Sequence, residues 1–235
     1  MASSSPMRQP PLARHHSGTI QYRGPDGETG REWFQMIDHG DAGRTLRALC
    51  RMDDIDLWRD VSMSLDAASR PRNAFVRITQ AGIMLGSMLY TIDSDALELD
   101  GVTAEHGRVS RRIALTEPLP YLGLHPLVGD ALVALCRGTD APGEFRTVHG
   151  YTNSSSPSGE TGLLAVPTAI AAAYIGDEQV TTPAGIFAGR HYQLRWQPQW
   201  PVADLWVSGD EALFLRLTWA FNRSCYELVE LRTLG

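Results

Sequence analysis

The sequence predicts a mostly β protein, built as a single antiparallel curved sheet or barrel with one short capping helix. The clearest support is the stretch 181–231, where runs rich in aromatic residues, Val, Leu and Thr are separated by PAG, QPQWP, SGDE and FNRS. Apolar residues alternate within these runs, so that Leu213, Leu215, Leu217 and Trp219 are expected on one face. Turn signals also recur about every ten residues from 31 to 115, a spacing typical of β-barrels and sandwiches.

The 235 residues fit one domain, and we expect a single β-barrel-like domain over residues 29–235. Residues 1–28 are rich in Ser, Pro, Arg and His with hardly any apolar periodicity, which predicts a flexible tail. The adjacent His15 and His16 could bind a metal weakly, but a solvated tail is the simpler interpretation.

The formal net charge of −6 argues against a nucleic-acid partner, because phosphate binding needs a basic surface. Every basic residue other than histidine is arginine, which excludes lysine Schiff-base chemistry and a P-loop. The three cysteines are far apart and form no C-x-x-C pair, so we expect buried thiols in a reduced cytoplasmic protein. The N-terminus lacks the apolar core of a signal peptide, and no apolar run is long enough to predict a membrane span.

The chain then divides into short elements. Two strands are expected over residues 31–52 around a Gly/Asp turn at 39–43, followed by an acidic turn. Asp53, Asp54 and Asp56 could suggest calcium, but the EF-hand spacing and its closing Glu are missing, which favours a surface turn. Further strands are expected over 57–66, 74–79, 83–92, 96–103 and 108–115.

The strand pattern stops at residues 116–138. Prolines and glycines open this segment, and the spacing of apolar residues over 127–136 then predicts a short helix that caps or plugs one end of the barrel. A strand ending near His149 leads into a polar loop at 151–162. The apolar stretch 163–175 fits either a strand or a helix.

The pieces PAGIFAGRHYQLRW, DLWVSGDEALFLRLTW and YELVEL resemble the closing strands of bacterial lipocalin-like half-barrels related to lipoprotein-carrier folds. The earlier pieces HGRVSRRIAL and GLHPLVGD are similar to proteins of the same kind. The resemblance covers about two thirds of the chain. Its motifs mark strand registers and not chemistry. It implies a curved sheet around an apolar lumen and carries over no catalytic residue. The periplasmic members carry signal peptides, which this N-terminus does not resemble.

Four residues are candidates for acid/base catalysis. His125 is the first, because it lies in a Pro- and Gly-containing loop where the strand pattern stops; its ring could instead only tie the loop down. His149 is expected at the barrel rim, where a plain hydrogen bond is the alternative. His191 lies on a strand, and Arg195 on the same face favours an outward position. Asp60 shares a half-polar face with Trp58, where an apolar neighbour would raise the pKa of the carboxyl.

Five residues are candidates for contact with a substrate. Tyr121, Tyr151 and Tyr192 adjoin the candidate histidines, and Trp58 adjoins Asp60. Arg111 has the parity of apolar neighbours, and an inward arginine needs a partner such as Asp60; a purely structural ion pair is the simpler interpretation. No nucleophile, phosphate or metal signature is present, so we expect no cofactor and no metal.

These observations favour a cofactor-independent lyase, isomerase, cyclase or hydratase acting on a small hydrophobic molecule, aromatic or terpenoid-like, in the lumen. The alternative is a carrier that binds the same kind of molecule without chemistry. A third hypothesis is an interaction module that binds another protein through strand edges or a Trp-rich surface. A homo-oligomer is compatible with all three.

Overall fold

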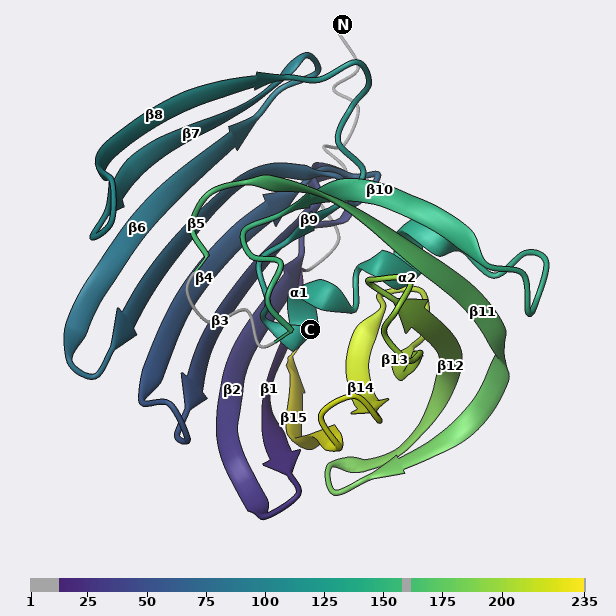
Figure 1. The fold of residues 1–235 in the computed structure, drawn as a ribbon. Helices are drawn as coiled ribbons and strands as arrows, with labels where there is room; N and C mark the ends of the chain where they lie inside the picture. The colour runs from purple at the N-terminus through teal and green to yellow at the C-terminus, as the bar shows by residue number, and fades with distance from the viewer. Residues whose placement is uncertain (1–12, 158–161, 235) are drawn as a thin grey trace, which may run out of the picture.

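The computed structural model describes residues 13–157 and 162–234. These residues form one continuous sheet of fifteen strands that curls around two short helices (Figure 1). Their bounds are β1 Arg14–Gly24, β2 Gly27–Asp38, β3 Arg44–Met52, β4 Leu57–Leu65, β5 Pro71–Gln80, β6 Ile83–Ile92, β7 Ala96–Thr103, β8 Gly107–Ala114, β9 Leu122–Gly123, α1 Leu127–Asp130, α2 Val133–Arg137, β10 Arg146–Thr152, β11 Val166–Thr182, β12 Gly185–Arg195, β13 Ala203–Ser208, β14 Leu213–Trp219 and β15 Ser224–Leu234. The 3-10 turn Gly40–Ala42 joins β2 to β3.

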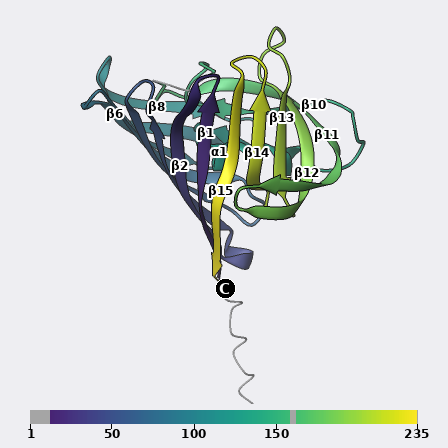
Figure 2. The same cartoon turned by 90° about the horizontal axis from the view of Figure 1, so that it is seen from below.

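The prediction of a mostly β, antiparallel curved sheet with a short helical segment is confirmed. The sheet order is β8-β7-β6-β5-β4-β3-β2-β1-β15-β14-β13-β12-β11-β10-β9. Strands that follow each other in the chain are therefore adjacent in the sheet, except β8 and β9, which lie at its opposite edges; in addition, β1 pairs with β15. That pair joins the two ends of the chain near the middle of the sheet (Figure 2). The sheet does not close, because β8 and β9 remain at its two edges.

The first strand corrects one expectation. Residues 14–24 are not part of a flexible tail, because β1 pairs with β2 on one side and β15 on the other. A strand needs few apolar residues when its backbone is hydrogen-bonded on both edges, and only Ile20 and Tyr22 of β1 are large buried hydrophobics. Of the predicted tail, residues 1–12 lie outside the described part of the chain.

The core lies on the concave face of the sheet and beneath the helices. On β4, Leu57, Val61 and Met63 are buried while Trp58 is exposed, as alternation predicts. The stretch left open by the sequence becomes β11, a strand of seventeen residues that passes over α2 (Figure 1). None of the described helices is long or apolar enough to cross a membrane.

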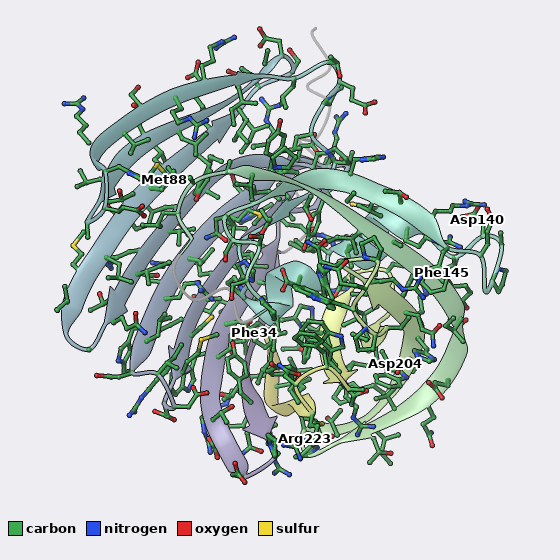
Figure 3. The ribbon with its side chains drawn as sticks, in the orientation of Figure 1. Phe34, Met88, Asp140, Phe145, Asp204 and Arg223 are labelled. Atoms are coloured by element: carbon green, nitrogen blue, oxygen red, sulfur yellow. The ribbon has the colours of Figure 1, made fainter. Side chains whose placement is uncertain are left out.

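Two buried charges attach the helical segment to the sheet. The carboxylate of Glu32, on β2, accepts hydrogen bonds from the backbone N–H groups of Leu127 and Val128 at 2.7 and 3.0 Å and from the Tyr22 hydroxyl at 2.8 Å. The guanidinium of Arg137 donates to four backbone carbonyls, on β11 and in the loop 138–144, which Asp140 marks in Figure 3. These contacts fix the position of the segment that carries the site described next.

Candidate functional site

A cavity of about 590 Å³ opens where several turns meet at one end of the sheet. Its wall contains parts of the β1–β2, β3–β4, β12–β13 and β14–β15 connections, together with the segments 121–130, 152–157 and 167–170. The volume lies in the range of pockets that hold a small molecule. The interrupted segment 116–138 therefore closes part of an end of the half-barrel and forms part of a cavity wall.

One side of this cavity is aromatic. Trp196, Trp200 and Trp219 line it, and the rings of Trp196 and Trp200 lie 5.1 and 5.4 Å from that of Trp219. The indole N–H of Trp219 donates to the carbonyl of Pro201 at 2.9 Å, which fixes the ring orientation. Aromatic rings with a fixed orientation offer a large apolar contact area and lose little side-chain entropy when a ligand binds.

Another part of the lining is polar and comes from residues 121–130. The Tyr121 hydroxyl donates to Asp130 Oδ1 at 3.1 Å, and both residues line the cavity. Burial raises the pKa of Asp130 to about 7, and the nearby Glu32 carboxylate acts in the same direction. Burial also raises the pKa of Tyr121, with the adjacent Asp130 charge as a further cause. Asp130 was not among the sequence candidates.

His125 lies in the same wall. Its Nε2 is 3.3 Å from the backbone carbonyl of Ser154, and burial together with the nearby Arg59 charge lowers the pKa of the ring to about 3. The imidazole is therefore neutral at physiological pH. The residue has φ of 72°, in the left-handed region that is uncommon for residues other than glycine.

The other three acid/base candidates do not reach this cavity. Asp60 is on the exposed face of β4, in a shallow groove with Trp33 and Arg47, and binds Arg77 at 2.7 Å. His149 is exposed on β10. Asp60, His149 and His191 therefore do not line the same cavity as His125, because their strand parity places them on the face opposite the core.

His191 forms a separate surface cluster on β12. Its Nε2 lies 2.8 Å from Asp204, and its ring stacks on Trp206 at a centroid distance of 4.6 Å. This is the outward position that Arg195, on the same face of the strand, favours for His191. The neighbouring Tyr192 is buried and packs against Tyr174 at 5.4 Å, so it forms part of the core and does not line the cavity.

The remaining binding candidates lie at separate places on the sheet and do not line the cavity. Tyr151 packs against the core without lining the cavity. Trp58 is 37% exposed, lies under the Arg51 guanidinium and stacks on Trp33. Arg111 has the parity of buried Val109 but is exposed, because β8 is an edge strand. An ion pair of Arg111 with Asp60 is not formed, since the partner of Asp60 is Arg77.

Arg59 is a buried charged residue that was not among the sequence candidates, although the sequence contained a signal for it. Arg59 is fully buried on β4, between Leu57 and Val61, where alternation alone places it inward. Its positive charge lowers the pKa of both His125 and Asp130, so the guanidinium lies near the polar wall. Among the residues that the structure describes, no group of three histidine, cysteine or carboxylate side chains is arranged to hold a metal ion.

Comparison with protein-family models gives no match, and neither does comparison with curated proteins. Among solved structures, the chain is similar to a beta-barrel-like protein of the domain of unknown function DUF1849 from Brucella abortus, with a TM-score of 0.56 and 10% identity over 95% of this chain and 98% of that one. A protein with a YmcC-like fold from Bacteroides fragilis matches with a TM-score of 0.34 and 13% identity over 93% and 95% of the two chains. The first likeness shows that this chain has a β-barrel-like fold.

Proposed function

We propose that the protein binds a small, largely apolar molecule in the cavity at the end of the half-barrel, as a carrier or binding protein with a lipocalin-like mode of binding. The observation that carries this proposal is the pairing of an aromatic wall, formed by Trp196, Trp200 and Trp219, with a polar wall from residues 121–130. Apolar surface supplies the affinity in such sites, and a few fixed polar groups set the orientation of the ligand.

Binding is favoured over the wider acid/base scheme because only His125 of its four residues lines the cavity. A histidine whose pKa is lowered to about 3 is also a weak base near neutrality. The fixed aromatic wall, in contrast, needs no partner residue to act.

A second candidate function is proton transfer on the bound molecule by Asp130. An aspartate whose pKa is about 7 can accept and return a proton at physiological pH, and Tyr121 orients it through a hydrogen bond. Asp130 would then transfer the proton, and the phenol of Tyr121 would position the carboxylate.

Titration with Nile red, an uncharged dye that fluoresces in apolar surroundings, tests the proposed binding. Replacing Trp200 with Ala should weaken dye binding by about fivefold or more, because a buried aromatic contact contributes roughly 1 kcal/mol or more. Trp206→Ala is the matched control, since Trp206 stacks on His191 outside the cavity. Equal loss in both variants, or no binding to the wild type, would contradict the proposal.

Mass spectrometry of a bound ligand separates the two functions. Incubation that returns the ligand unchanged supports the carrier. A product that disappears in the Asp130→Asn variant supports proton transfer.

A further inference from the structure

The polar wall of the cavity contains a carboxylate with one oxygen that no donor among the described residues contacts. Asp130 Oδ1 accepts from Tyr121, whereas Oδ2 has no donor among the residues that the structure describes. The charged groups that act on this carboxyl are Glu32 and Arg59, and neither side chain lines the cavity. Above its pKa of about 7 this carboxyl is ionised and only accepts hydrogen bonds. The wall therefore offers a strong acceptor to whatever occupies the cavity.

His125 adds a second acceptor. A backbone carbonyl cannot donate, so the contact between His125 Nε2 and the Ser154 carbonyl requires the hydrogen on Nε2. The Thr152 hydroxyl is satisfied by the same carbonyl at 3.1 Å. In the neutral ring, Nδ1 then carries a lone pair, and no donor to it is present among the described residues. The tautomer thus leaves Nδ1 of this cavity-lining residue as an acceptor.

The fixed donors of this wall are already used. The Tyr121 hydroxyl hydrogen is given to Asp130, which leaves the phenol oxygen as a third acceptor. The hydroxyls of Ser154 and Thr168 can act either way and do not discriminate between ligands. Arg23 is the one cationic side chain in the described lining; it is exposed, and its Nε donates to Gln21.

We infer that the ligand carries a hydrogen-bond donor, a hydroxyl or an N–H group, at one end of a flat apolar ring system. This inference rests on the proposed binding function and specifies its ligand class. The ring system would lie against Trp196 and Trp200, and the donor would bind Asp130 and His125. A ligand whose only polar group is an ether would leave both acceptors without a donor, and a carboxylate would face the Asp130 charge.

A matched set of naphthalene probes tests this inference by isothermal titration calorimetry of the wild-type protein. The probes are 2-naphthol, which donates, 2-methoxynaphthalene, which only accepts, and 2-naphthoate, which is anionic. We expect 2-naphthol to bind at least about tenfold more tightly than either of the others, the size expected for one hydrogen bond to a charged group.

The Asp130→Asn variant converts the free acceptor into an amide that can donate. It should reduce the preference for 2-naphthol over 2-methoxynaphthalene by about fivefold or more. Asp204→Asn is the matched control, because Asp204 binds His191 outside the cavity, and it should leave the preference unchanged.

A second measurement needs no variant and remains decisive if Asp130→Asn does not fold. The preference of the wild type for 2-naphthol should be smaller at about pH 5.5 than at about pH 8.5. These two pH values lie on either side of the pKa of Asp130, so the carboxyl is protonated at the lower pH and ionised at the higher one. Equal affinities for the three probes, or tightest binding of 2-naphthoate, would overturn the inference while leaving the binding function intact. If none of the probes binds and Nile red does not bind either, the proposed function and this inference both fail.

Discussion

Replacing His125 with Asn should make the protein less sensitive to acid. The folded state lowers the pKa of this ring from 6.5 to about 3, so the unfolded chain takes up the proton first as the pH falls. Stability attributable to the neutral ring is therefore complete above pH 6.5 and is lost between about pH 6.5 and pH 3. Asn cannot titrate, and it tolerates the left-handed backbone at this position, where φ is 72°.

The magnitude follows from the size of this shift. One pKa unit corresponds to about 1.4 kcal/mol, so the 1.5 units between pH 6.5 and pH 5 amount to roughly 2 kcal/mol. This is an upper limit, because the half-buried ring retains some contact with water. The hydrogen bond lost to Ser154 costs the variant the same free energy at every pH and cancels when two pH values are compared.

The assay is urea denaturation of both proteins at pH 7.5 and pH 5. From the higher to the lower pH, the variant should gain up to about 2 kcal/mol of unfolding free energy relative to the wild type. His149→Asn makes the same replacement at an exposed site and should change stability by less than about 0.5 kcal/mol at both pH values. A His125→Asn difference that does not change with pH would refute the assignment of His125 as a ring that the folded state keeps neutral.

Three further changes have predicted outcomes. Glu32→Leu leaves the Tyr22 hydroxyl and two backbone N–H groups without their acceptor and should cost about 3 kcal/mol or more by urea denaturation, with Glu28→Gln on the exposed hairpin as the near-neutral control. Asp130→Asn should gain up to about 3 kcal/mol of unfolding free energy relative to the wild type from pH 5 to pH 8, because the folded state raises this pKa from 3.8 to about 7 and so makes ionisation unfavourable; a difference that does not change with pH would contradict the shift. Gly18→Val places a Cβ 2.6 Å from the Glu230 carbonyl oxygen and should lower the thermal midpoint, whereas Gly27→Ala, where nothing lies within 4 Å, tests the conformational cost alone.

Local alternation was sufficient to predict most of the sheet. The runs over β3 and β4 have the predicted buried faces, with Leu46, Ala48 and Cys50 inward on β3. The turn at 39–43 also lies where its two glycines and Asp41 indicate. Such patterns are local, so a single sequence can reveal them.

The site depends on contacts that local patterns do not contain. β1 joins β15, a strand some two hundred residues later, and the sequence of β1 alone resembles a polar tail. The polar wall and the aromatic wall come from distant parts of the chain, and the cavity that they share includes Asp130 but not His149. Arg59 and Glu32 occupy inward positions by parity, so a charged residue within an apolar alternation was the available signal.

A crystal structure of the protein with bound 2-naphthol tests the central claim most directly, namely that the cavity between the tryptophans and residues 121–130 is a ligand site. The ring should lie beside Trp196 and Trp200, with its hydroxyl within hydrogen-bond distance of Asp130. A ring bound on the exposed face beside Trp33 and Trp58, with the cavity left without ligand, would contradict the claim.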